Sequence, residues 1–303
     1  MAAPAATPGQ FTPRLAIYFV IITLIWGSTW LVIKTQLGVV PPSWSVAWRF
    51  LLGGSVMVAV CLATGRSLAI GWRGHLFAVF VAVMQFVLNF NLVYRAEQHL
   101  PSGLVALSFA LLLVPNALLS GIFLGQRTTL RFAIGSLIGL IGVGMMVARD
   151  LVMPGADSAA ILLGLALAFG GVLSASVANV MQASPLGRSL PLEGGLAWSM
   201  AYGGVFNAIV AWVLAGPPVI DWSPAYLAGL VYLGIVASAV AFTLYYALIR
   251  GLGAGRAAYS GVVVPVVAMA LSTVFEAYVW TPLAVAGGTL AMLGLVVALR
   301  SRG

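Results

Sequence analysis

Charged residues are scarce in this sequence. The chain has 14 basic and 6 acidic side chains among 303 residues, and 7% of its residues are charged against 62% that are hydrophobic. A soluble domain carries about 25% charged residues, so a water-covered surface cannot be built from this composition. We therefore expect a protein embedded in a lipid bilayer, which excludes a cytosolic enzyme and a secreted disulfide scaffold.

Residues that commonly build catalytic and metal centres are also few. The single cysteine, Cys61, cannot form an internal disulfide, and there are two histidines. The sequence has no HExxH motif, no GxxxxGK[ST] motif and no Cys/His cluster with metal-ligand spacing. We predict no metal, no cofactor and no enzymatic activity. The net charge of +8 is scattered between apolar runs, so no nucleic-acid partner is expected.

Acidic residues are missing from the middle of the apolar runs. All six lie at the ends of these runs or between them. Proton-coupled carriers often use a carboxylate buried in the membrane. This absence favours a facilitator or an exchanger, or ion coupling through an end residue such as Glu97 or Glu276.

Long hydrophobic runs, by contrast, are abundant. A membrane-spanning helix needs about 20 mostly apolar residues, and the chain has ten such runs with no two-residue alternation of the kind seen in β-barrels. The predicted fold is therefore an all-α integral membrane protein. Its spans are Arg14–Lys34, Ser43–Ala63, Arg73–Tyr94, Leu100–Gly121, Leu130–Arg149, Ser158–Val180, Leu192–Ala215, Pro224–Ile249, Gly255–Phe275 and Thr281–Leu299.

The ends and loops predict an orientation. Residues 1–13 are rich in Ala and Pro without a basic segment, which predicts a disordered cytoplasmic tail rather than a signal peptide. With the N-terminus inside, ten basic residues fall on the inner side and three on the outer side. Positive residues favour the cytoplasmic side, so both termini are expected to lie in the cytoplasm, with the protein in the cell membrane.

The two halves of the sequence resemble each other at a nearly constant spacing. Ala47-Trp48 recurs as Ala197-Trp198, and Pro115 recurs as Pro265, each 150 positions later. Five spans per half is an odd number, so the second half must enter the membrane from the opposite side. We predict two inverted five-helix repeats, residues 14–152 and 153–303, in one structural unit. Inverted repeats are typical of alternating-access carriers with a site near the bilayer midplane.

Several motifs resemble the EamA-type branch of the drug/metabolite transporter superfamily. They are Trp26-Gly27-Ser28 with Lys34 in the first span, Trp48-Arg49-Phe50 in the second, Pro115 with Leu124-Gly125-Gln126 in the fourth, and Pro265 with Glu276 in the ninth. Gln126 departs from the family, which usually has an acid there. The resemblance implies ten helices around a central cavity, a place in the bacterial inner membrane, and export of amino acids, including aromatic ones, or of other small metabolites.

Arg49 is the charged residue placed deepest in a span. It lies about six residues into the second span, or roughly 9 Å along the axis. An arginine at the centre of a membrane helix costs about 2.5–3.5 kcal/mol on insertion scales. It either binds the carboxylate of a substrate or holds the helices together through their terminal carbonyls, and the sequence leaves both roles open.

Aromatic and amide side chains at helical spacing predict the wall of a cavity for an amphipathic solute. Packing between helices is an equally good explanation for the deeper tryptophans and for the amides. Trp48 and Trp198 are equivalent in the two halves, so pseudo-symmetry would place them on opposing walls. With Arg49, the predicted substrate-binding residues are Trp26, Trp30, Trp48, Gln85, Asn89, Trp198, Tyr202, Tyr245 and Tyr259.

Two prolines interrupt the backbone hydrogen bonds of equivalent spans. Pro115 and Pro265 are predicted hinges or gates, with static kinks as the alternative. Gly135 and Gly139 form a GxxxG motif that permits close helix contact, within the chain or with a second copy, so the oligomeric state is expected to be a monomer or a weak homodimer.

These features predict a transporter that exports amino acids by alternating access. The alternative within the superfamily is a nucleotide-sugar or sugar-phosphate antiporter, which needs several buried cations for phosphate. A scaffold without transport activity and a membrane enzyme are the alternatives from other classes.

Overall fold

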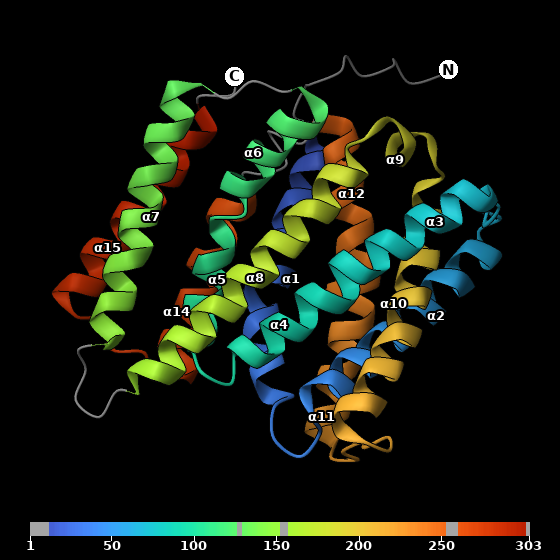
Figure 1. Cartoon of the computed structure of the whole chain (residues 1–303), viewed down its shortest axis with the longest axis horizontal. Helices are drawn as coiled ribbons and strands as arrows, with labels where there is room; N and C mark the ends of the chain where they lie inside the picture. Colours follow the sequence, from blue (N-terminus) through green and yellow to red (C-terminus); the bar gives the residue numbers. More distant parts are fainter. Residues whose placement is uncertain (1–11, 126–128, 152–156, 253–259, 301–303) are drawn as a thin grey trace.

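The computed structural model describes residues 12–125, 129–151, 157–252 and 260–300. These residues are helical throughout, with short connections and no strand (Figure 1). Most of the predicted tail, the predicted boundary between the halves and Tyr259 lie outside this part of the chain. The elements are α1 (Pro13–Thr35), α2 (Pro42–Ala63), α3 (Gly71–Val81), η1 (Ala82–Leu88), α4 (Asn89–Ala96), α5 (Ser102–Ala110), α6 (Leu113–Leu124), α7 (Leu130–Leu151), α8 (Ser158–Gln182), α9 (Pro185–Ser189), α10 (Leu192–Ala215), α11 (Pro224–Val231), η2 (Tyr232–Val240), α12 (Ala241–Leu252), α14 (Ser260–Phe275) and α15 (Pro282–Arg300).

Eight of these helical runs, within the described residues, are long and apolar enough to cross a membrane. They agree with the first eight predicted spans to within a few residues. The ninth and tenth predicted spans appear as the shorter apolar helices Val263–Phe275 and Pro282–Ala298. Large apolar side chains such as Leu137, Ile141 and Ile209 are exposed on the outer faces, as a bilayer would require.

Local sequence explains where the helices begin. Pro occupies the first helical positions of α1, α2 and α11, where its missing N–H leaves no hydrogen bond unmade. At the start of α8, the Asp157 carboxylate accepts a hydrogen bond from the Ala160 N–H at 3.0 Å. The short helix α9 begins in the same way, with Ser184 as its cap, and apolar periodicity did not predict it because it carries no buried residue.

Two of the described segments are π-helical, and their separation equals the spacing of the predicted repeats. η1 begins at Ala82 and η2 begins at Tyr232, 150 positions later. Each lies between two α-helical parts of one long run, α3 and α4 in the first half and α11 and α12 in the second. A π-turn leaves backbone carbonyls that need other donors, and such turns are frequent at functional sites.

Glycines allow two pairs of helices to contact each other through their backbones. α2 crosses α10 at Gly54 and Gly204, where an added Cβ would lie 2.8 Å from Ala201 N and 2.7 Å from Leu51 N, respectively. α7 packs along α15 (Figure 1), and a Cβ on Gly135 would lie 2.3 Å from Ala298 N. The glycine motif of α7 therefore has its partner within the same chain.

We expect Gly204→Ala to destabilise the protein by about 1–3 kcal/mol, since the new methyl group would collide with the backbone of α2. Gly195→Ala is the matched control, because it lies in the same helix with nothing within 4 Å of its Cβ. That control should be neutral or slightly stabilising, as alanine favours a helix over glycine by about 0.5–1 kcal/mol. Thermal unfolding in detergent measures both, and equal midpoints for the two variants would contradict the close contact.

Candidate functional site

A cavity of about 170 Å³ lies at the centre of the bundle. Since one water molecule takes about 10–15 Å³ on this measure, the cavity holds on the order of ten waters or a solute with a similar number of heavy atoms. Seven long helical runs contribute to its wall. The lining residues are Trp26, Thr29, Trp30, Ile33, Arg49, Gln85, Asn89, Phe90, Val93, Ala106, Phe109, Ala110, Leu112, Leu113, Asn116, Ala175, Asn179, Phe242, Tyr245, Ser260, Gly261, Val264 and Pro265.

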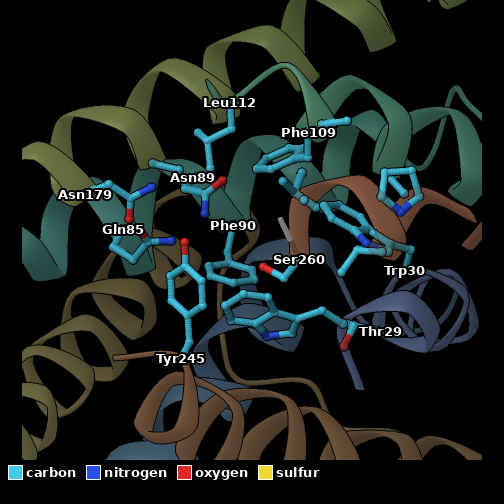
Figure 2. Close-up of a pocket in the computed structure, with 18 of the residues that line it drawn as sticks. Thr29, Trp30, Gln85, Asn89, Phe90, Phe109, Leu112, Asn179, Tyr245 and Ser260 are labelled. Carbon is cyan, nitrogen blue, oxygen red and sulfur yellow. The ribbon is translucent and has the colours of Figure 1, made fainter. Parts of the chain in front are cut away.

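One side of the cavity is polar. Figure 2 shows Gln85, Asn89 and Asn179 gathered on it, with the hydroxyl of Tyr245 pointing toward Gln85. Gln85 and Asn89 are four residues apart and share a helix face, as the sequence predicted. The Asn89 side-chain oxygen is buried without a hydrogen-bond partner in the described structure. It is therefore a buried acceptor with an unmade hydrogen bond, on a residue that lines the cavity.

The other side is aromatic. The ring centroids of Trp30 and Phe109 lie 4.9 Å apart, and Figure 2 shows both rings beside the cavity. Trp26 packs on Tyr245 at 4.8 Å, and its indole N–H donates to the Ala237 carbonyl at 3.3 Å. The predicted residues Trp26, Trp30 and Tyr245 thus contribute flat apolar surfaces to the wall, held in fixed orientations by their neighbours.

Arg49 supplies the positive charge of the cavity wall. Its side chain is 1% exposed, and its Nε donates to Ser238 Oγ at 2.9 Å. The guanidinium carbon lies 4.4 Å from the centroid of the Phe90 ring, a distance that allows a cation–π interaction. Its Nη1 atom has no hydrogen-bond partner among the described residues. A buried guanidinium nitrogen without a partner favours a carboxylate that enters the cavity.

The two π-helical segments hold the polar groups of the site. In η2, the Ser238 hydroxyl donates to the Leu233 carbonyl at 2.8 Å while it accepts from Arg49. In η1, which carries Gln85, the Phe86 carbonyl accepts from the Asn207 side chain of α10 at 2.9 Å. A side-chain hydroxyl in η2 and a side-chain amide beside η1 thus donate to backbone carbonyls of the π-helical segments. These contacts fix Gln85, which η1 carries, and Arg49, which donates to Ser238 of η2.

Three predicted site residues lie away from the cavity. The indole N–H of Trp48 donates to the Val219 carbonyl and that of Trp198 donates to the Leu68 carbonyl, each at 2.9 Å. The Tyr202 ring stacks on Trp198, and its hydroxyl lies 2.9 Å from Nδ1 of His75. Each equivalent tryptophan contacts a connection in the other half of the chain, so the two lie in equivalent environments but not on the cavity wall.

The two prolines differ in their effect on the backbone. The fourth predicted span is broken between α5 and α6 at Leu111–Leu112, just before Pro115. Pro115 is buried but lies outside the cavity lining. α14 continues through Pro265 without a break, and Pro265 lines the cavity. The hinge role predicted for both residues is an open proposal.

Several lining residues are not among the predicted substrate-binding residues. Thr29, Phe109, Asn116, Asn179 and Ser260 line the cavity, and the Asn116 carbonyl oxygen accepts from the Ser176 hydroxyl at 2.7 Å. The helical spacing of Ala175 and Asn179 with Ser176 shows a small and polar face on α8. That face could have been read from the sequence, whereas the bend that turns Asn116 inward could not.

The cavity extends toward one side of the bundle. We call the side where α1 begins and α15 ends the terminal side, at the top of Figure 1. The lining includes Ser260 and Gly261 in the first turn of α14 on this side. On the opposite side, hydrogen bonds join the ends of the helices. The Lys34 ammonium donates to the carbonyls of Glu97 and Leu100, and Ser102 donates to the Glu276 carboxylate.

Known proteins resemble the chain over most of its length. A sequence model described as the EamA-like transporter family matches residues 14–148 and 162–300. The uncharacterized inner membrane transporter YedA of Escherichia coli is 28% identical over 87% of this chain and 83% of its own length. The uncharacterized transporter YvbV of Bacillus subtilis is 22% identical over 86% of this chain and 84% of its own.

Two further similarities are more limited. Protein PagO of Salmonella typhimurium is 25% identical over 126 residues, which is 42% of this chain and 41% of that protein. The chain thus aligns with less than half the length of this relative. A protein of known crystal structure covers 95% of this chain, and the chain covers 97% of it, with a TM-score of 0.70 and 24% identity. This likeness shows a shared fold.

Proposed function

Because the chain belongs to the EamA-like transporter family, we propose that it exports amino acids, aromatic ones among them, by alternating access. Because the members of this family are transporters, the chain is a membrane transporter, and the relatives YedA and YvbV carry the same description. The observation that supports the substrate class is the cavity itself, whose wall combines Arg49, with its unpartnered Nη1 atom, and several aromatic rings. A carboxylate and an apolar side chain on one small solute match these two features.

The arrangement of polar groups supports an α-amino acid over a simple carboxylic acid. In our proposal the carboxylate of the substrate binds Arg49. The α-ammonium group donates to the side-chain oxygens of Asn89 and Gln85, both of which are buried on the cavity wall. The side chain of the substrate then lies against the paired rings of Trp30 and Phe109. The volume, on the order of ten heavy atoms, is of the size of an amino acid.

Several observations support the proposal that the halves are inverted five-helix repeats, giving ten spans. The family model matches a stretch in each half, and the π-helical segments begin 150 residues apart. Gly54 contacts Ala201 and Gly204 contacts Leu51, which are reciprocal contacts under the same 150-residue spacing. If the two repeats exchanged their conformations, the cavity would open first to one side of the membrane and then to the other.

We further propose a bacterial inner membrane with both termini in the cytoplasm. The excess of basic residues on the terminal side supports this orientation, and YedA is named an inner membrane transporter. The terminal side then faces the cytoplasm. A cavity that extends toward this side, with hydrogen-bonded helix ends on the other, supports the assignment of this conformation to the state that takes up a substrate for export.

A sugar-phosphate or nucleotide-sugar antiporter is the less favoured alternative. A phosphate carries up to two negative charges, which typically require several buried cations. Arg49 is the one basic side chain among the described residues that line the cavity. This charge fits a single carboxylate better than a phosphate.

Purified protein in liposomes tests the proposal directly. With radiolabelled tryptophan and no imposed ion gradient, we expect saturable uptake that unlabelled aromatic amino acids, methionine or threonine compete away. Empty vesicles set the background, and a sugar phosphate serves as a competitor of the other class. Uptake no faster than in empty vesicles, or competition by the sugar phosphate alone, would exclude an amino-acid carrier.

A further inference from the structure

A carboxyl group without any hydrogen-bond partner lies where the cavity is closed. The Glu97 side chain is 0% exposed, and neither of its carboxylate oxygens has a partner in the described structure. Glu97 follows α4 directly, one turn beyond the lining residue Val93. An ionised carboxylate in such a place is expensive, whereas a protonated one is far less so.

The cationic group nearest in the fold does not pair with this carboxylate. Lys34 ends α1 one turn beyond the lining residue Trp30, and its ammonium donates to the backbone carbonyl of Glu97 and to that of Leu100 at 2.9 Å. No ion pair between Lys34 and Glu97 occurs among the described residues. The ammonium thus ties α1 to the end of α4 but leaves the carboxyl group without a partner.

A second carboxylate nearby, that of Glu276, has hydrogen-bond partners. Glu276, just beyond α14, accepts hydrogen bonds from the backbone N–H of Ser102 at 3.1 Å and from its hydroxyl. This contact joins α14 to the first turn of α5. We call Lys34, Glu97, Ser102 and Glu276 the closure cluster, because together they connect the ends of α1, α4, α5 and α14 on the opposite side.

From this geometry we propose that Glu97 is a proton-binding site and that its protonated form holds the closure cluster shut. The proton comes from water and binds one carboxylate oxygen. It returns to water when the cluster opens and the carboxylate becomes hydrated. The physiological role of this site rests on the proposed transport function. In that function, each opening of this side would release one proton.

The electrostatic surroundings favour the protonated form in the closed state. Burial raises the pKa of the Glu97 carboxyl well above its usual range; Lys34 opposes this shift, Glu276 adds to it and Arg49 opposes it. The buried hydroxyl of Tyr94 on α4 also interacts with Glu97, and Arg95 and His99 are charged or ionisable neighbours along the chain. Since the closed state binds the proton more tightly than a hydrated state would, closure is favoured at low pH and is lost as the pH rises through the raised pKa.

A thiol reporter beneath the cluster tests this without any substrate. Ser272 of α14 is fully buried, and its Cβ lies 3.0 Å from a Cβ built on Gly103 of α5. In a Cys61→Ala background, Ser272→Cys should react slowly with a membrane-impermeant maleimide in detergent at mildly acidic pH. At mildly alkaline pH the reaction should be at least about tenfold faster than in the same protein carrying Glu97→Gln. Because the two proteins are compared at the same pH, ionisation of the Ser272→Cys thiol affects both reaction rates equally.

Two further variants make the result decisive. Glu97→Leu also lacks a titrating group and should stay slow like Glu97→Gln, which guards against a folding defect in either. Glu193→Gln removes an acid on the terminal side that lies 3.9 Å from Arg66, and it should keep the full pH response. An equal response in the Glu97→Gln protein, or no response in its parent, would overturn the proposal.

Transport measurements then separate this inference from the proposed function. In liposomes with the same pH on both sides, the rate of exchange of labelled for unlabelled tryptophan should change with pH in the parent, while the rate in the Glu97→Gln protein should stay nearly constant. If the parent carries no amino acid but the thiol reporter responds to pH through Glu97, the substrate assignment fails and the proton site stands. If tryptophan moves but the exchange rates of both proteins depend on pH in the same way, Glu97 does not control closure and the inference fails.

Discussion

Arg49→Gln is expected to abolish the preference of the protein for tryptophan over tryptamine, which lacks the carboxylate. Hydrogen bonds to charged groups are worth about 1.5–3 kcal/mol, so the unmodified protein should prefer tryptophan by about 10–100-fold. In the variant the ratio should fall close to one, because the glutamine can still bond to Ser238 but offers no charge. Competition of labelled uptake by each unlabelled compound measures the ratio.

The ratio, rather than the total flux, distinguishes substrate binding from a structural role. Loss of a buried arginine can lower flux simply by disturbing the helices, but this would reduce transport of both compounds alike. Arg66→Gln is a suitable control, since the Arg66 side chain is 62% exposed and lies outside the cavity. An unchanged ratio in the Arg49→Gln protein would show that Arg49 holds helices together and does not contact the carboxylate.

Filling the cavity should block transport altogether. Ala175 on α8 is 3% exposed and lines the cavity, so Ala175→Phe would place an aromatic ring in the space for the substrate. We expect flux to fall at least about 100-fold, because a close-packed interior leaves no room for both the ring and a solute. The initial rate of uptake into liposomes measures this effect.

A neighbouring position provides the matched control for this variant. Leu173 lies two residues earlier on α8 and is 40% exposed on the outer face, so Leu173→Phe should leave flux unchanged. Both proteins should unfold at nearly the same temperature as the parent, since an existing cavity accommodates the added volume. Undiminished flux in the Ala175→Phe protein would mean that substrates take another path.

The sequence predicted the parts of the site that depend on periodicity and on the rarity of charge in membranes. Gln85 and Asn89 share a helix face, and Arg49 is too costly to face lipid. All three line the cavity. Trp26 and Trp30 follow from the same helical spacing. These residues need only local geometry and the polarity of the solvent to be placed.

Trp48 and Trp198 show what could not be predicted. Their equivalence was readable, and the structure gives them equivalent hydrogen bonds. How far each lies from the centre of the bundle depends on how α2 and α10 cross, which the backbone contacts at Gly54 and Gly204 decide. The break before Pro115 and the unbroken course of α14 through Pro265 likewise depend on neighbouring helices rather than on proline alone.

The reciprocal crossing of α2 and α10 also bears on how such a molecule can diversify. If two identical copies of one half formed this crossing as a homodimer, an arginine at position 49 of one copy would be matched by the same arginine in the other copy. In the fused chain, the matching position lies 150 residues later. In this chain that place is taken by Ser199, whose hydroxyl is satisfied by the Gly195 carbonyl of its own helix at 2.8 Å. Covalent fusion of the halves removes the obligation to mutate both together. A gene of this kind can therefore acquire or lose a single charge in its cavity in one mutational step, which under the proposed substrate binding would change its cargo.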